Sequence, residues 1–246
     1  MIERHETIDS TNNRAKELAR SGAPEGTVVI SRAQTSGRGR LGRSFHSPQG
    51  QGLYLSLILR PNCPADQLMH LTCAVAVASC DGIYDVTGFR PSIKWINDLI
   101  AHGEKLGGIL TELSISPSTG LVEWAVVGIG INCAQQSFPP ELADIACSLA
   151  QITGSSPDLG RLEQALLDRL LQINSVLLTQ QSYIMDRYRQ NCITIGRQIQ
   201  VLGAQSQQAT ALDVADDGAL LVDYGNGFPE KVTVGEVSIR GLMGYT

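Results

Sequence analysis

The sequence predicts an α+β protein in which helices pack on a mixed, largely antiparallel sheet and a small β-unit follows at the C-terminus. Two observations predict this fold. Up to residue 191, segments with helix caps alternate with apolar strand-like runs, and three of those runs follow one another through short turns. After Cys192 the chain holds only short strand-like runs, separated by Gly and by the turn Asp216-Asp217-Gly218. We therefore expect two domains, residues 1–191 and 192–246.

The expected helices are defined by their caps and by the spacing of their apolar residues. Ser10 is an N-cap ahead of good helix formers, and Gly22 is placed to end this first helix. In the second helix, Cys73, Val77 and Cys80 recur at the spacing of one helical face. We expect helices over residues 11–20, 66–86, 139–151, 158–179 and 181–190.

The expected strands are apolar runs bounded by turn residues. Residues 53–59 are apolar almost throughout, which is typical of a buried strand. The runs 92–101, 105–113 and 121–132 are joined by short turns and should form antiparallel hairpins. The other expected strands span residues 27–31 in the large sheet and 199–202, 210–214, 219–222 and 231–234 in a small C-terminal β-barrel.

Composition argues against several classes of protein. The 246 residues are 43% hydrophobic and 17% charged, with a formal net charge of −5, as in an ordinary globular protein. The pI near 5.4 opposes a general nucleic-acid binder. No apolar stretch reaches transmembrane length, the start is not a signal peptide, and the six cysteines form no close pair, so we expect a cytoplasmic protein with reduced thiols. The four histidines are scattered, and we expect no metal site.

The most unusual segment is a loop rich in glycine and arginine. From Gly26 to Ala65 the chain has no Asp or Glu, although acids outnumber bases in the whole chain. The centre of this window is the run Gly37-Arg38-Gly39-Arg40-Leu41-Gly42-Arg43. Glycine lets the backbone approach a ligand, and guanidinium groups are forked donors that suit phosphate or carboxylate. The loop is predicted to bind an anion, although a solvated surface loop is the alternative.

The loop matches the pattern G-x-G-x-x-G at Gly37, Gly39 and Gly42, but the rest of a dinucleotide site is missing. Such a site needs a helix that starts inside the motif and an acidic residue about 20 positions later. Here Pro48 and the glycines after it preclude a helix, and the first acid is Asp66. Kinase and P-loop motifs are also missing, so the loop must bind its anion in another way.

Two features of the expected sheet point to a ligand. Lys94 lies in an otherwise apolar strand, where it is either an ammonium that faces an anionic ligand or a lysine on the open face of an edge strand. Gly128 and Gly130 in one strand, with Gly107-Gly108 in its neighbour, would leave a slot for a flat ligand. The alternative for these glycines is a β-bulge.

Two polar positions have both a structural and a functional interpretation. Asn132, just after the glycines, is either a donor to a phosphate or an ordinary turn residue. The segment Ser10-Thr11-Asn12 either only caps the first helix or also presents its free N–H groups to a polar ligand.

Five motifs, taken in their order, resemble those of biotin protein ligases, which attach biotin to carboxyl-carrier proteins. They are Ile8-Asp9-Ser10-Thr11-Asn12, Gly37 to Arg43, Lys94-Trp95-Ile96-Asn97-Asp98, Lys105 to Leu110 and Gly128 to Asn132. The resemblance covers the whole chain and implies a class II synthetase-like catalytic domain followed by a small SH3-like β-barrel. It also implies that biotin reacts with ATP, whose Mg²⁺ is held mainly through the phosphates, to give biotinyl-5′-AMP. A lysine of a biotin carboxyl carrier protein then takes the biotin and releases AMP.

The resemblance also implies roles for individual residues. Lys94 and Arg40 would be catalytic, with Lys94 bridging the biotin carboxylate and the α-phosphate. The residues implied to bind ATP are Arg40, Arg43, Phe45, Lys94 and Asn132. The residues implied to bind biotin are Ser10, Thr11, Asn12, Gln34, Arg38, Gly39, Arg40, Lys94, Gly108, Leu110, Gly128 and Gly130.

The chain departs from the family pattern at two positions. Ile96 stands where the family usually has proline, and Phe45 where it often has a tryptophan that stacks on adenine. Many relatives also carry a DNA-binding domain before the catalytic domain, whereas the catalytic motifs here begin within the first ten residues. We expect no nucleic-acid or membrane partner, and a monomer or homodimer. The alternatives are a lipoate ligase or octanoyl transferase of the same fold and an RNA-binding module, which would need aromatic residues interleaved with arginine.

Overall fold

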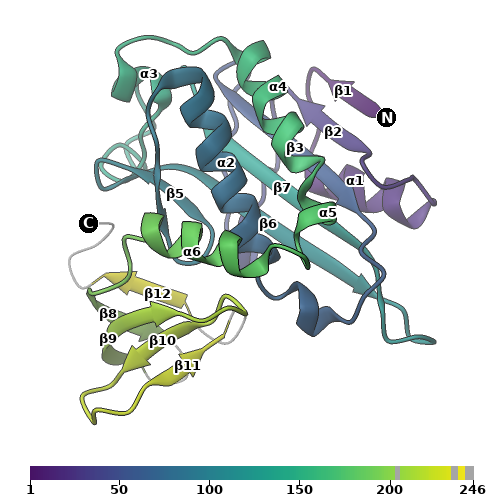
Figure 1. The fold of residues 1–246 in the computed structure, drawn as a ribbon. Coiled ribbons are helices and arrows are strands. Elements are labelled where there is room, and N and C mark those ends of the chain that lie inside the picture. Colours follow the sequence, from purple (N-terminus) through teal and green to yellow (C-terminus); the bar gives the residue numbers. More distant parts are fainter. Residues whose placement is uncertain (203–205, 234–237, 242–246) are drawn as a thin grey trace.

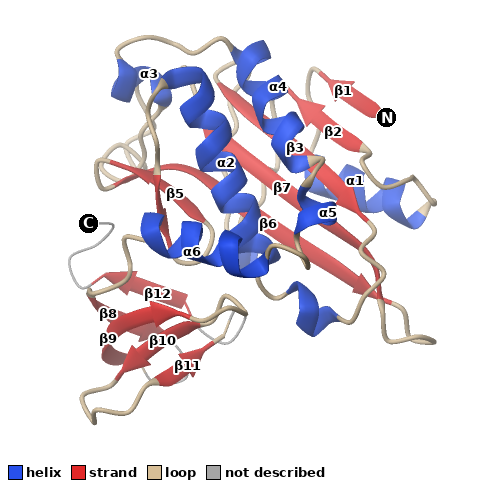
Figure 2. Ribbon diagram, in the orientation of Figure 1, coloured by secondary structure: helices blue, strands red, loops and turns tan. Residues whose placement is uncertain are grey.

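The computed structural model describes residues 1–202, 206–233 and 238–241, which form two sheets and their covering helices (Figure 1). A seven-stranded mixed sheet carries helices on both faces, and a separate five-stranded antiparallel sheet is built from the C-terminal residues (Figure 2). The α+β fold class predicted from the sequence is therefore confirmed. The expected end of the last predicted strand, at Val234, lies outside the described residues.

The large sheet has the strand order β1-β2-β3-β7-β6-β5-β4. Its β1–β2 pair is parallel, and the pairs that join the remaining strands are antiparallel, including the expected β5–β6–β7 hairpins. The strands are β1 (Ile2–His5), β2 (Val28–Ser31), β3 (Gly52–Leu59), β4 (Ser92–Lys94), β5 (Asp98–Ala101), β6 (Glu104–Ile115) and β7 (Val122–Asn132).

Opposite faces of the large sheet are covered by different helices, because successive strand residues point to opposite sides. Helix α1 (Thr11–Arg20) packs Ala15 and Ala19 in one cluster with Val29 and Ile58. The neighbouring strand residues point the other way, into the main core, where helices α2 (Leu71–Thr87), α4 (Leu159–Leu170) and α6 (Gln181–Asn191) cover the sheet (Figure 1). The shorter helices are α3 (Leu149–Thr153) and α5 (Ile173–Val176), and two single 3₁₀ turns span Arg40–Gly42 and Ala65–Leu68.

Three of the expected helices differ from the observed ones. The helix expected over residues 139–151 is wrong for most of its length, since only Leu149–Thr153 is helical. The helix expected over 158–179 is interrupted after Leu170, and the one expected from residue 66 begins at Leu71 after a 3₁₀ turn. Strand β1 was not expected at all, because its sequence Ile-Glu-Arg-His has a single apolar residue.

The C-terminal sheet packs on the rest of the protein through a shared core. Its strand order is β11-β10-β9-β8-β12, and all its pairs are antiparallel. Buried residues of this sheet, such as Ile199 and Val214, belong to the same hydrophobic cluster as the core under α2. The strands are β8 (Gln198–Leu202), β9 (Gln207–Val214), β10 (Leu220–Asp223), β11 (Glu230–Val232) and β12 (Ser238–Gly241).

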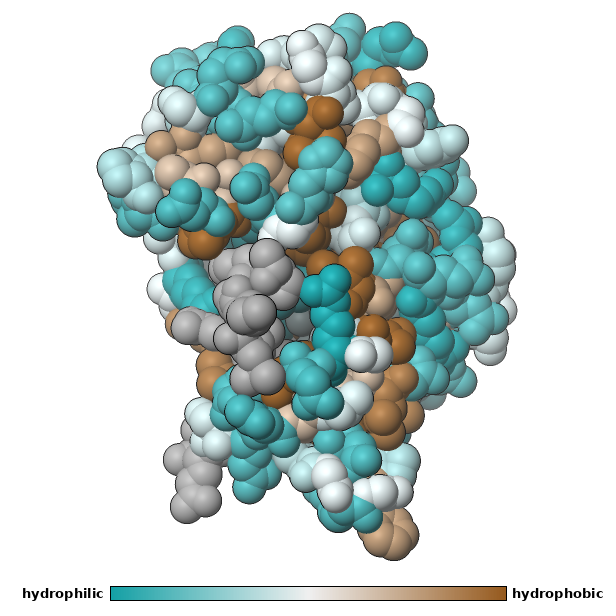
Figure 3. Space-filling model, turned by 90° about the vertical axis from the view of Figure 1, so that its left-hand side faces the viewer, coloured by the Kyte–Doolittle hydropathy of each residue, from teal (hydrophilic) through white to brown (hydrophobic). Residues whose placement is uncertain are grey.

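None of the helices in the described part of the chain is both long and apolar enough to cross a bilayer. In the space-filling view, most of the visible surface is hydrophilic and the apolar residues show in small groups between polar ones (Figure 3).

Candidate active site

A cavity of about 790 Å³ opens beside the arginine loop, the N-terminus of α1 and the strands β4 to β7. It brings together segments that are far apart in the sequence, and every residue that the family resemblance implied for biotin or ATP lines it. These residues are Ser10, Thr11, Asn12, Gln34, Arg38, Gly39, Arg40, Arg43, Phe45, Lys94, Gly108, Leu110, Gly128, Gly130 and Asn132.

The N-terminus of α1 meets the loop through Gln34. Ser10 is the N-cap, and its hydroxyl accepts the backbone N–H of Asn13 at 3.5 Å. The first N–H of the helix, that of Thr11, donates to Gln34 Oε1 at 2.9 Å, and the amide nitrogen of Gln34 donates to Ser47 Oγ at 2.9 Å. The N-terminus of α1 therefore does more than start a helix. Its free N–H group also anchors the base of the loop through Gln34.

Asn12 fills the space left by a missing side chain in β7. Its Oδ1 accepts from Ser56 Oγ at 2.6 Å, and its amide nitrogen donates to Leu110 O at 3.3 Å and to Glu112 Oε2 at 3.0 Å. A Cβ atom on Gly128 would lie 1.9 Å from Asn12 Oδ1. Gly128 thus makes room for Asn12 rather than for a ligand, which corrects the expectation of an open slot at this position.

Gly130 has the same relation to Phe45. A Cβ atom on Gly130 would lie 2.6 Å from the ring of Phe45, so the aromatic ring rests directly on this strand. The ring also meets Tyr54 edge to face, with 6.4 Å between the ring centroids. The slot expected above the glycines for a flat ligand is therefore occupied at Gly130 by the ring of Phe45, which lines the cavity from the loop.

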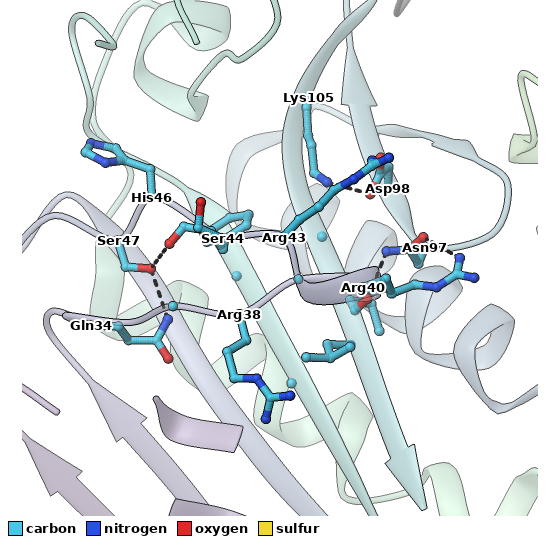
Figure 4. Close-up of a pocket in the computed structure, with 18 of the residues that line it drawn as sticks. Gln34, Arg38, Arg40, Arg43, Ser44, His46, Ser47, Asn97, Asp98 and Lys105 are labelled. Carbon is cyan, nitrogen blue, oxygen red and sulfur yellow. Dashed lines mark hydrogen bonds and ion pairs between the residues drawn. The ribbon is translucent and has the colours of Figure 1, made fainter. Parts of the chain in front are cut away.

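The arginine loop folds as a short hairpin across the cavity (Figure 4). Its backbone is closed by hydrogen bonds from Phe45 N to Gly37 O at 2.8 Å and from Gly39 N to Arg43 O at 2.7 Å. Gly37 must be glycine, because a Cβ atom there would lie 2.3 Å from Phe45 O. The hairpin sends its three arginines in different directions, so each contacts a different part of the cavity.

The arginines of the loop attach it to both sides of the cavity. Arg38 Nη1 donates to Asn13 Oδ1 at 2.8 Å on the side of α1, and Arg40 Nη1 donates to Asn97 Oδ1 at 3.1 Å on the side of β4 (Figure 4). Burial lowers the pKa of the Arg40 guanidinium, and the nearby Asp98 carboxylate opposes this shift. A guanidinium is too basic to lose its proton in a protein, so Arg40 remains a cation at neutral pH.

Lys94 is the last residue of β4, the edge strand of the large sheet. The strand is thus an edge strand, as one interpretation from the sequence had it, while Lys94 itself is half-buried and lines the cavity; that it faces an anionic ligand stays a prediction. The residues after it turn back into β5, and the Trp95–Ile96 peptide bond, where the family usually has proline, is cis.

The electrostatic character of the cavity is positive. Five basic side chains line it and two acidic ones, Asp98 and Glu141, accompany them. Asp98 is paired with Lys105 at 2.7 Å, and Arg43 extends from the loop on the side of this pair (Figure 4). Such a site suits a ligand with several negative charges, because cations arranged in advance need little reorganisation.

Asn132 faces the cavity but its amide group is already engaged. Its nitrogen donates to Cys147 O at 3.0 Å and to Lys105 O at 3.4 Å, and its oxygen accepts from Gln135 at 3.3 Å. The geometry makes Asn132 a residue that holds together the chain segments behind the cavity. Its expected contact with a nucleotide stays a prediction.

Sequence reasoning missed three residues that line the cavity and two that hold its wall in place. Asn97, Asp98 and Lys105 stood within the quoted motifs and line the cavity, so their polar character was a usable signal. Ser56 and Glu112 are isolated polar residues within strands, and their hydrogen bonds to Asn12 depend on partners far away in the sequence. Burial raises the pKa of the Glu112 carboxyl, but hydrogen bonds from Lys16 and Asn12 and the charge of Arg38 outweigh burial and hold it below its ordinary value.

The described residues contain no group of three or more His, Cys, Asp or Glu side chains arranged to hold a metal ion. The two carboxylates of the cavity do not form a cage, since Asp98 is paired with Lys105.

Comparisons with known proteins match this architecture. The Biotin/lipoate A/B protein ligase family matches residues 5–132, and the biotin protein ligase C terminal domain matches residues 194–240. The bifunctional ligase/repressor BirA of Bacillus subtilis is 44% identical over 165 residues, 66% of this chain and 50% of that protein. The biotin–[acetyl-CoA-carboxylase] ligase of Mycobacterium tuberculosis is 32% identical over 235 residues, 93% of this chain and 85% of that protein.

A solved structure agrees over nearly the whole length. The biotin protein ligase from Aquifex aeolicus in complex with biotin and ATP superposes with a TM-score of 0.83 at 26% identity, over 98% of both chains. The chain spans about half the length of the Bacillus relatives that it matches. Because the family match covers more than half of the sequence and includes the arginine loop, Lys94 and the glycine strand, this chain belongs to the biotin/lipoate A/B protein ligase family.

Proposed function

We propose that the protein is an ATP-dependent ligase that activates biotin as biotinyl-5′-AMP and transfers it to a lysine of a biotin carboxyl carrier protein. The observation that carries the proposal is the single cavity in which Lys94, Arg40 and the other residues implied by the resemblance converge. The likeness to a biotin protein ligase in complex with biotin and ATP supports it.

In the first reaction, an oxygen of the biotin carboxylate attacks the α-phosphorus of ATP and pyrophosphate leaves. Negative charge builds on the α-phosphate as the new P–O bond forms. Lys94, which lines the cavity, would contact both the carboxylate and the phosphate, and Arg40, held by Asn97 at 3.1 Å, would add a second fixed cation. Cations that are positioned before the reaction stabilise this charge without reorganisation.

In the second reaction, the amine of the carrier lysine attacks the carbonyl carbon of the mixed anhydride. The amide bond forms, the C–O bond to the phosphate breaks, and AMP leaves with the electron pair. The arginine loop has the position to retain the intermediate between the two reactions, because it crosses the cavity and is attached on both sides through Arg38 and Arg40.

The proposal includes the conditions of the reaction. Mg²⁺ would enter with ATP and be held mainly by the phosphates. The protein would work in the cytoplasm as a monomer or homodimer, without a nucleic-acid or membrane partner, and residues 192–246 would form a domain of their own. Lipoate or octanoate in place of biotin is the alternative for the same fold.

Pyrophosphate exchange into ATP tests this proposal. We expect exchange that depends on biotin and is not supported by lipoate or octanoate. Lys94→Ala should slow the exchange by about 10²- to 10³-fold, since this is the usual effect of removing one strong charge stabiliser. Arg161→Ala, which removes an exposed basic side chain of α4 outside the cavity, is the matched control and should leave the rate unchanged. Near-normal exchange by Lys94→Ala would contradict the assigned role, and exchange driven by lipoate would favour the alternative.

A further inference from the structure

One acidic residue next to the cavity has no part in the proposed chemistry. Glu112 lies in β6, and three side chains from elsewhere in the chain contact its carboxylate. Lys16 Nζ lies 2.8 Å from Oε1, Asn12 Nδ2 donates to Oε2 at 3.0 Å, and Arg38 Nη1 lies 3.4 Å from Oε1. The Glu112 side chain is 23% exposed, so these contacts are partly shielded from water.

Two of these three partners line the cavity and come from different elements. Asn12 belongs to α1 and forms part of the wall beside Gly128, whereas Arg38 belongs to the arginine loop. The Glu112 carboxylate therefore connects strand β6, helix α1 and the arginine loop. Lys16 also comes from α1 but does not line the cavity, and it balances the charge of the carboxylate.

The contacts of Glu112 lie at one of the two points where the loop is attached to the rest of the protein. On the far side, Arg40 donates to Asn97, and on this side, the Arg38 guanidinium donates to Asn13 and pairs with Glu112, while the charge of Asp9 also acts on it. The Asn13 bond is neutral, while the Glu112 contact joins opposite charges. The Glu112 contact is an ion pair rather than a hydrogen bond, and because the carboxylate is partly shielded from water, its attraction adds to the Asn13 bond in setting the position of Arg38.

We propose that Glu112 is a positioning residue for the biotin site, because its carboxylate fixes Asn12 in the wall and directs Arg38 of the loop at the same time. The expected effect of Glu112 on biotin binding rests on the proposed function. The wall and the loop are then coupled, so that the loop closes on a ligand from a preset position.

The test compares Glu112→Gln with Glu123→Gln in the full chain. Glutamine keeps the size of the side chain and an acceptor oxygen but removes the charge that pairs with Lys16 and Arg38. Glu123 is an exposed glutamate on the neighbouring strand β7, so its replacement is the matched control. In pyrophosphate exchange, Glu112→Gln should raise the KM for biotin roughly tenfold with a smaller change in kcat, and Glu123→Gln should change neither.

A double-mutant cycle tests whether Glu112 acts through Arg38. In the variant with both Glu112→Gln and Arg38→Met, the KM for biotin should rise by less than the product of the two fold-increases seen in the single variants. The reason is that both changes remove the same contact. Independent, multiplying effects on KM would mean that Glu112 does not act through the loop, and they would overturn the coupling.

A second readout does not depend on the reaction. Hydrogen exchange of residues 36–47 in the protein without ligand should be faster in Glu112→Gln than in the wild type or Glu123→Gln. Unchanged loop exchange and an unchanged KM, even with a lower melting temperature, would make Glu112 a merely structural residue and overturn the proposal. Should the wild type show no biotin-dependent exchange, the proposed function fails, while the loop measurement still decides whether Glu112 holds Arg38.

Discussion

At the scale of the residue, Gly128 shows how a missing side chain can serve the protein itself. The space above this glycine is occupied by the amide of Asn12, which is 4% exposed and hydrogen-bonded to Ser56, Leu110 and Glu112. An alanine at position 128 would place Cβ 1.9 Å from Asn12 Oδ1. Because non-bonded atoms cannot approach so closely, Asn12 would have to move and lose these hydrogen bonds.

We expect Gly128→Ala to destabilise the protein by about 1–3 kcal/mol, the usual cost of overpacking a buried site. The free energy of unfolding, measured with a chemical denaturant, checks this. Gly160→Ala is the control, because Gly160 is exposed near the start of α4 and an added methyl group there meets only the Asp158 side chain at 3.4 Å. Equal stability of Gly128→Ala and the wild type would show that Asn12 can move at little cost.

At the scale of the element, the arginine loop is held by few contacts. Its tip carries Leu41, which is 65% exposed and has a φ of 56°, a region that favours glycine. Arg38 and Arg43 are exposed as well. Few contacts thus restrain the loop, and we expect it to gain order when an anion binds.

We therefore expect hydrogen exchange of residues 36–50 to slow when biotinyl-AMP binds, because the phosphate and the arginines then restrain the backbone. The buried strand β3 (Gly52–Leu59) provides the internal control, and its exchange should be slow with and without ligand. The same protection of the loop in both states would contradict a closing movement.

The elements also show what the sequence could and could not predict. Hairpins β5 to β7 and helix α1 were predictable, since their turns, caps and apolar patterns are local signals. Residues 139–151 carry a helical pattern, but Lys105 N donates to Ile145 O at 2.9 Å and Cys147 N donates to Lys105 O at 3.0 Å. These long-range bonds to β6 replace helical ones, and the helix starts only after Ser148, which forms a capping box with Gln151.

The same reasoning separates the site residues that motifs indicate from those that they do not. The loop arginines and Lys94 are unusual in their local sequence, and a resemblance to a family assigns them roles. Ser56 and Glu112 are ordinary polar residues in strands, and their importance follows only from Asn12, more than forty positions away in each case. Contacts of such long range depend on the packing of α1 on the sheet, which no local pattern encodes.

At the scale of the whole molecule, the C-terminal sheet supports the strand end that carries Lys94. The turn between β9 and β10 reaches Trp95, whose indole Nε1 donates to Gly218 O at 2.8 Å. Gly218 has a φ of +84°, and a Cβ atom there would lie 3.2 Å from the sulfur of Cys73 in α2, so the turn is closely packed. Helix α6 adds a bond from Tyr188 to Ile96 O at 3.2 Å. The segment between Lys94 and Asn97 is thus held from behind by two parts of the chain.

This arrangement predicts that the C-terminal sheet contributes to catalysis only by holding the segment between Lys94 and Asn97 in position. Trp95→Phe keeps an aromatic ring but removes the hydrogen bond to Gly218, and we expect a loss of about 1–3 kcal/mol in the free energy of unfolding, because the buried carbonyl loses its donor. The KM for ATP in pyrophosphate exchange should rise as well, since Lys94 and Asn97, the partner of Arg40, flank the loosened residue.

Trp124→Phe separates the effect on the site from a general loss of stability. Trp124 is as buried as Trp95, each being 6% exposed, but it packs under α1 with Ala15 and Ala19, away from the C-terminal sheet. It should lose stability through the smaller ring while the KM for ATP stays close to that of the wild type. If both variants had the same KM, the bond between Trp95 and Gly218 would hold the two sheets together without positioning Lys94, and the C-terminal sheet would have no part in binding the nucleotide.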